Sequence, residues 1–221
     1  MGPEKEGSLN ESGKTVVDQT GRALGPRALA TRERLLEATL AELSVSSLRD
    51  LKVTDLVKRV GTSPATFYQY FRDVEEAVLQ LAIRASHEMP AIADLIDGDW
   101  SGEVGLDRAR AITSAFIEHW DRHRAALRIR NTASDEGDRR FLAIRDEAMT
   151  PMLTAVSRQI ILYRGSSLAA GEHPGAAAAA VGAILERLAS YHTELETIGI
   201  TRENLVETVA RIVRKTITDE A

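Results

Sequence analysis

Residues 51–71, LKVTDLVKRVGTSPATFYQYF, predict two short helices joined by a tight turn. The first helix has one apolar face, formed by Val53, Leu56, Val57 and Val60. Gly61 can adopt the left-handed conformation that ends a helix. Ser63 followed by Pro64 is typical of an N-cap and the first helical position after it. These local signals agree on a helix-turn-helix.

The second predicted helix has two unlike faces. A step of about 100° per residue puts Phe67, Tyr70 and Phe71 on one side and centres Ala65, Tyr68 and Gln69 on the other. Such a helix fits the major groove of DNA, where glutamine pairs with adenine and alanine or threonine methyls contact the thymine methyl. Phosphate contacts are expected from nearby cations, namely Lys52, Lys58, Arg59 and Arg72. Alternatively, the two helices form only a corner in an all-α core.

Charge and composition support the DNA-binding interpretation. The 221 residues carry a net charge of -5, yet residues 27–72 hold 8 Lys and Arg against 5 Asp and Glu, an excess of +3. The absence of cysteine excludes disulfides, thiolate metal sites and cysteine nucleophiles, and it fits the cytoplasm. Because the sequence contains no nucleophile elbow, phosphate loop, dinucleotide fingerprint or His-Glu-x-x-His pair, we expect no enzyme and no cofactor.

The chain divides into three segments. Residues 1–26 are polar and lack sustained periodicity, so we expect a flexible N-terminal arm. From there on, apolar residues recur at spacings of three and four, which predicts an all-α fold of about nine helices. We expect a DNA-binding domain at 27–72 and a larger domain at 73–221. The longest uncharged apolar run, Pro174 to Leu185, is too short to span a membrane.

Four short stretches closely resemble the N-terminal domain of the tetracycline-repressor (TetR) family. They are Thr31 to Ala38, Val53 to Leu56, Gly61 to Ser63 and Thr66 to Phe71, and they match in register over about 50 residues. The resemblance implies a homodimeric transcriptional regulator that binds a palindromic operator. It also implies a repressor that leaves the DNA when a small molecule binds the larger domain.

The resemblance assigns roles to residues by their position in the family's motif. The implied major-groove contacts are Ser63, Ala65, Thr66, Tyr68 and Gln69, and the implied phosphate contacts are Thr54 and Tyr70. Family members typically carry a lysine just after the aromatic end of this helix, where this chain has Val74. We therefore expect Arg72 to replace that phosphate contact, or the contact to be absent.

Apolar side chains in the larger domain suggest a ligand site. Aromatic and methionine side chains make adaptable apolar walls. The candidate residues for binding a largely apolar effector are Ile112, Phe116, Trp120, Phe141, Met149 and Met152. The cavity itself is implied by the resemblance, because the apolar pattern indicates only an inward face. If these residues instead fill a solid core, the protein is a DNA-binding regulator without an effector.

Two histidines on one predicted helix have metal-ligand spacing. His119 and His123 stand four apart, and Glu118 or Asp121 would be the third ligand. Without cysteine and with no firm third ligand, we expect no metal site, and we interpret the pair as surface histidines near a helix end.

The last two predicted helices each carry one broad apolar stripe. The resemblance implies that they pair with their twofold mates in a four-helix bundle. The candidate dimer contacts are Val181, Ile184, Leu185, Leu188, Leu205, Val209 and Ile212. Alternatively, both stripes pack only within one chain.

Overall fold

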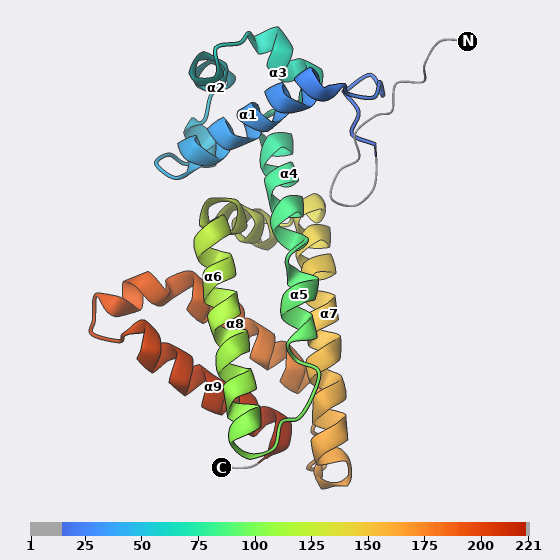
Figure 1. Cartoon of the computed structure of the whole chain (residues 1–221), viewed down its shortest axis with the longest axis vertical. Helices are drawn as coiled ribbons and strands as arrows, with labels where there is room; N and C mark the ends of the chain where they lie inside the picture. The colour runs from blue at the N-terminus through green and yellow to red at the C-terminus, as the bar shows by residue number, and fades with distance from the viewer. Residues whose placement is uncertain (1–14, 220–221) are drawn as a thin grey trace.

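A computed structural model describes residues 15–219, and within this range the regular structure is helical (Figure 1). The helices are α1 (Pro26–Leu43), α2 (Val53–Val60), α3 (Pro64–Tyr70), α4 (Val74–Ser86), α5 (Met89–Asp94), α6 (Gly102–Asp135), α7 (Arg139–Arg164), α8 (Pro174–Glu196) and α9 (Arg202–Thr218). The predicted all-α fold is confirmed. No helix in the described range is long and apolar enough to cross a membrane.

The small unit at the top of Figure 1, which we call the head, comprises residues 15–73. Its core is closed by buried side chains of α1, α2 and α3, including Leu35, Leu36, Leu56, Phe67 and Phe71. Gly61 ends α2 with a φ of 71°, and the Ser63 hydroxyl accepts a hydrogen bond from the Thr66 amide at 3.2 Å. The helix-turn-helix predicted from the sequence is therefore present, with the predicted cap at each side of its turn.

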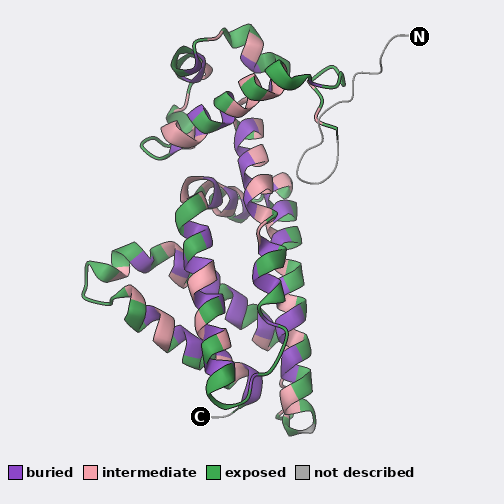
Figure 2. Ribbon diagram, in the orientation of Figure 1, coloured by how far each residue is buried: buried purple, intermediate pink, exposed green. Residues whose placement is uncertain are grey.

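The larger unit, which we call the body, comprises residues 87–219. Its long helices α6 and α7 lie beside α5, and α8 and α9 pack against α6 and α7 (Figure 1). Buried residues occupy the inward faces of these helices, and exposed residues the outward faces (Figure 2). Close helix packing is clearest at Gly182 of α8, where an added Cβ would lie 2.8 Å from the Leu153 side chain of α7.

Helix α4 joins the two units. Ala77 and Leu81 belong to the head core, and Ala85 belongs to the body core. Between them, Val78 and Ala82 pack with Leu43 of α1, Phe141 and Ile144 of α7 in a smaller cluster. Helix α4 is therefore packed into both cores, and α6 also contacts the head directly, since its Ala126 belongs to the head core.

The N-terminal segment differs from the expected flexible arm. Residues 1–14 lie outside the described residues, but 15–25 fold against the head, where Val17 bridges Ala23 and Leu24 is only 3% exposed. The Asp18 carboxylate accepts hydrogen bonds from the Thr20 and Arg22 amides and closes the turn. These short-range bonds and one buried leucine order the segment without any helical or strand periodicity. Sequence periodicity therefore could not predict its packing.

Candidate nucleic-acid interface

Helix α3 presents a polar and aromatic face to solvent. Four of the expected DNA contacts are exposed here, and we call them the recognition face: the N-cap Ser63 and Ala65, Tyr68 and Gln69 of α3. Thr66 is half-buried. Tyr68 is 52% exposed, and its ring packs edge-on against the fully buried ring of Phe67 at a centroid distance of 5.6 Å. The buried phenylalanine therefore holds the α3 helix, and its exposed tyrosine, in a fixed orientation.

The two residues expected at phosphates occupy different environments. Thr54 is exposed on the first turn of α2. Tyr70, however, is only 7% exposed and packs in the head core, because it lies on the same side of α3 as Phe67 and Phe71. Burial, together with the nearby charge of Asp18, raises the pKa of its hydroxyl. Tyr70 is therefore a core residue of the head, and little of its side chain is accessible to a DNA phosphate.

Four cations lie within or beside the helix-turn-helix in the sequence. Lys52, the N-cap of α2, and Lys58 on α2 are exposed, and Arg59 of the same helix pairs with Glu42 at 2.9 Å. Arg72 follows α3 and is exposed, with its Nε 3.0 Å from the Asp73 carboxylate. Val74, at the position where the family typically has lysine, is half-buried on the first turn of α4.

The N-terminal turn around Gln19 packs against the C-terminal end of α3, a contact that the sequence did not predict. The backbone N–H of Gln19 donates to the carbonyl of Gln69 at 3.0 Å, and its side-chain amide donates to the carbonyl of Tyr70 at 3.1 Å. The exposed Arg22 is therefore held near the C-terminal end of α3. The sequence signal was local, since Asp18 followed by Gly21 is a common turn composition.

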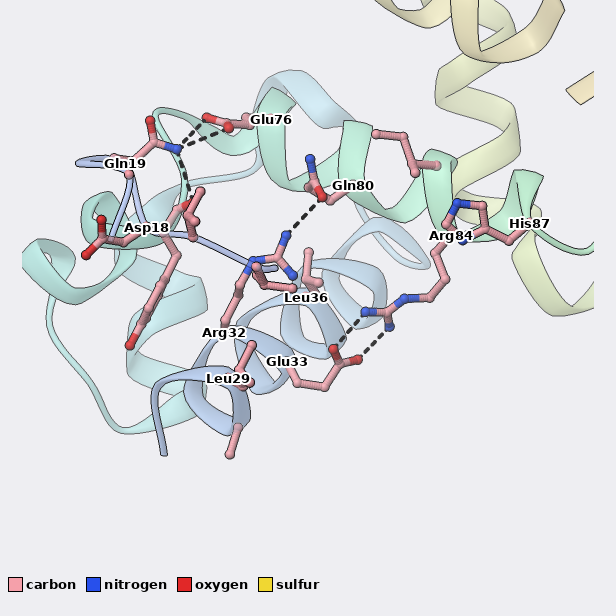
Figure 3. Close-up of a pocket in the computed structure, with 16 residues that line it drawn as sticks. Asp18, Gln19, Leu29, Arg32, Glu33, Leu36, Glu76, Gln80, Arg84 and His87 are labelled. Atoms are coloured by element: carbon pink, nitrogen blue, oxygen red, sulfur yellow. Dashed lines mark hydrogen bonds and ion pairs between the residues drawn. The ribbon is translucent and has the colours of Figure 1, made fainter. Parts of the chain in front are cut away.

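A cavity of about 840 Å³ lies between the N-terminal turn, α1 and α4 (Figure 3). Arg32 of α1 donates to Gln80 of α4 at 2.9 Å. Arg84 of α4 forms a two-pronged ion pair with Glu33 of α1, at 2.5 and 2.7 Å. These bonds, which Figure 3 draws as dashed lines, connect α4 to the head along one side of the cavity.

The predicted effector residues lie in two places. Ile112, Phe116, Trp120 and Met152 are buried in the body core, and the half-buried Met149 packs against them. Phe141 belongs instead to the cluster between α4 and α7 that includes Val78. The structure therefore brings five of the six residues to one core and leaves Phe141 closer to the head.

The predicted dimer residues lie at different depths. Val181, Leu185, Leu205 and Val209 are buried inside the single chain, in the body core. Ile184 and Leu188 are half-buried, and Ile212 is 41% exposed. The exposed side of α8 carries small residues in its first half, namely Ala176, Ala179, Ala180 and Ala183, and continues into the exposed Arg187 and Tyr191.

The two histidines, expected on the surface, lie at different depths. His119 is 2% exposed, because its position on α6 faces the region where α4 ends and α5 begins, whereas His123 is half-buried and reaches solvent. The expected third ligands point elsewhere: Glu118 pairs with Arg202 at 3.5 Å, and Asp121 pairs with His192 at 3.2 Å. The carboxylate beside the histidines belongs to Glu88, which is 31 residues before His119.

Comparisons with known proteins point to one family. The family profile described as "Tetracyclin repressor-like, C-terminal domain" matches residues 92–221. YdgC of Bacillus subtilis, described as an uncharacterized HTH-type transcriptional regulator, is 36% identical over 55 residues. That stretch makes up 25% of this chain and 28% of YdgC, so the chain matches less than a third of that relative's length.

Solved structures share the fold over nearly the whole chain. A putative TetR-family regulator from Syntrophomonas wolfei has a TM-score of 0.60 at 16% identity, covering 85% of this chain and 94% of that one. FadR of Bacillus subtilis, solved in complex with stearoyl-CoA, has a TM-score of 0.60 at 9% identity, with coverages of 86% and 99%. Reduced NemR of E. coli has a TM-score of 0.57 at 17% identity, with coverages of 86% and 100%.

Proposed function

We propose that the chain is a homodimeric cytoplasmic repressor that binds a palindromic operator and is released from it by a small molecule. The proposal starts from its family, since the chain belongs to the tetracycline-repressor family of transcriptional regulators. Its family and relatives are regulators and not enzymes. The single observation that carries the DNA-binding proposal is the recognition face of α3, exposed on a rigid helix-turn-helix.

The chemistry of the recognition face suits the major groove. Gln69 can pair with an adenine edge, and the Ala65 methyl can contact a thymine methyl. Tyr68 can donate its hydroxyl to a phosphate. The N-terminus of α3, capped by Ser63, and the exposed Lys52 and Lys58 supply the positive potential that attracts the DNA backbone.

Two heads are needed to read two half-sites, which lie about 34–36 Å apart on DNA. We propose that α8 and α9 meet their twofold mates through the exposed small residues of α8 and through Ile212. Small side chains allow helices to approach closely. Val181, Leu185, Leu205 and Val209 then support this surface from inside the chain, while Ile184 and Leu188 lie at its edge.

The proposed release depends on α4. An apolar effector that enters among Phe116, Trp120 and Met152 must spread the helices around the body core, against which α4 packs through Ala85. A tilt of α4 changes the distance between the two heads, and a few ångströms of change weakens one head's contacts while the other is docked. Stearoyl-CoA, which is bound in the FadR structure, is a precedent for a ligand with a long apolar acyl chain on this fold. If no effector enters this core, the body serves only to dimerise the heads.

Selection of bound sequences from a random DNA pool tests the proposal. We expect the full chain to enrich a motif with two half-sites, and the Tyr68→Ala, Gln69→Ala double variant to lose that motif. Val104→Ala is the control, because this exposed residue lies at the start of α6, at the far end of the body (Figure 1). No enrichment by the full chain at low salt, or equal enrichment by the double variant, would overturn the DNA-reading role.

A further inference from the structure

Three side chains with metal-binding atoms meet where α4 and α5 join beside α6. Glu88 lies immediately before α5, and His119 and His123 lie one turn apart on α6. The Glu88 carboxylate is 2.7 Å from His123 Nε2 through Oε1 and 3.3 Å from His119 Nδ1 through Oε2. All three ligand atoms lie within 4.8 Å of one another. The fold, and not the local sequence, assembles this cluster.

The donor set suits a transition metal. Two imidazole nitrogens and one carboxylate form a known zinc ligand set, with metal–ligand distances of about 2.0–2.2 Å. Ligand atoms around a tetrahedral ion at such distances are separated by roughly 3.3–3.6 Å. The 3.3 Å separation between Glu88 and His119 falls in this range, and the shorter 2.7 Å separation between Glu88 and His123 must widen by roughly 0.6–0.9 Å to admit an ion.

The cluster has a fixed inner side and an open outer side. His119 is nearly fully buried, and its Nε2 finds no hydrogen-bond partner among the described residues, so its Nδ1 is the nitrogen turned toward Glu88. Glu88 and His123 reach solvent, which leaves room for water ligands. Arg122 donates to Glu88 at 2.7 Å and is more than half exposed, so it can turn into solvent when a cation takes its place.

We propose that Glu88, His119 and His123 bind one divalent transition-metal ion, with Zn²⁺ the best match to the ligand set. The ion joins the C-terminal end of α4 to α6, because Glu88 follows α4 by two residues and both histidines lie on α6. Metal binding here is independent of whether the head binds DNA. Any effect of the ion on DNA affinity rests on the proposed function.

Calorimetric titration of Zn²⁺ into the full, tag-free chain, after chelator treatment and removal, tests the proposal. We expect one Zn²⁺ per chain with a Kd in the micromolar range or tighter, and a higher Tm with Zn²⁺ present. Glu88→Gln and His123→Gln are each expected to weaken binding at least tenfold, since each removes one of only three protein ligands. His173→Asn is the matched control, because His173 is an exposed histidine at the start of α8 whose capping role asparagine can retain.

A spectroscopic readout separates this site from adventitious binding. Co²⁺ in the full chain is expected to show the visible absorption of a nitrogen- and oxygen-ligated ion, which both ligand variants lose and His173→Asn keeps. Circular dichroism confirms that each variant is folded before titration. The proposal is overturned if the full chain binds no Zn²⁺, or if folded Glu88→Gln and His123→Gln bind it as tightly as the unchanged chain.

Discussion

The backbone N–H of Gln19 lies 3.0 Å from the carbonyl oxygen of Gln69, so the N-terminal turn is attached directly to the end of the α3 helix. The Gln19 side chain strengthens the attachment by donating to the Tyr70 carbonyl at 3.1 Å and to the Glu76 carboxylate at 3.1 Å. A segment that composition alone predicts to be flexible is in this way part of the head surface.

Gln19→Ala is expected to loosen the N-terminal turn. It removes the side-chain bonds to Tyr70 and Glu76 but leaves the backbone bond to Gln69 possible. A neutral hydrogen bond contributes about 0.5–1.5 kcal/mol, so amide hydrogen exchange in residues 15–25 should accelerate by about 2- to 10-fold. Arg27→Ala, an exposed change on α1, is the control. Unchanged exchange in Gln19→Ala would show that the turn is held by other contacts, chiefly Leu24.

Arg72→Ala is expected to weaken DNA binding without changing which sequence is selected. Arg72 is exposed just after α3, beside the position where Val74 replaces the family's usual lysine. A phosphate contact contributes about 0.9 to the slope of log affinity against log salt concentration. We therefore expect the slope to fall by about one, while Arg158→Ala, on the body, leaves it unchanged. An unaltered slope in Arg72→Ala would mean that Arg72 touches no phosphate.

Gly105→Ala is expected to destabilise the body. A Cβ at Gly105 would lie 1.9 Å from the Trp100 carbonyl oxygen, which belongs to the backbone and cannot simply rotate away. Overpacking of this kind typically costs about 1–3 kcal/mol in unfolding free energy. Chemical denaturation measures it, with the exposed neighbour Val104→Ala expected to change stability by less than about 0.5 kcal/mol. Equal stability of the two variants would show that the start of α6 shifts freely.

A buried ion cluster connects α6, α7 and α8. The Glu186 carboxylate of α8 accepts hydrogen bonds from Arg130 at 2.8 Å, from Arg145 at 2.6 Å and from the Asn131 side chain at 3.1 Å. Glu186 and Arg130 are both almost fully buried. The buried Arg130 therefore depends on this one carboxylate for charge compensation, whereas the partly exposed Arg145 also lies near Asp135 and Asp146.

Glu186→Gln is expected to cost about 3–5 kcal/mol of unfolding free energy, because it leaves buried Arg130 without an opposite charge. Glu147→Gln, at an exposed position of α7, is the control. Burial opposes ionisation of Glu186, but the Arg145 hydrogen bond and the Arg130 charge lower its pKa overall. Its stabilising effect is thus complete above about pH 4.5 and lost as pH falls through the lower, folded-state pKa. If the unfolding free energy of the unchanged chain and of Glu186→Gln fell equally in acid, Glu186 would not be the group whose protonation destabilises the protein.

The helices and their ends were predictable from the sequence because their signals are local. The three- and four-residue apolar spacing, Gly61 and the Ser63–Pro64 pair act within one or two turns of the chain. The outward face of α3 followed in the same way, since helix geometry alone places Phe67 opposite Tyr68 and Gln69. Local sequence therefore determined the element that carries the proposed DNA contacts.

Tertiary structure decided everything that depends on distant neighbours. An apolar stripe says that a helix buries one side but not against what, so the sequence could not separate the buried Val181 from the exposed Ile212. It also could not show that Leu24 closes the head core, or that Glu88 and not Glu118 lies beside His119. Glu88 and His119 are 31 positions apart, and Leu24 lies in a segment without periodicity. Only the packing of the helices brings such residues into contact.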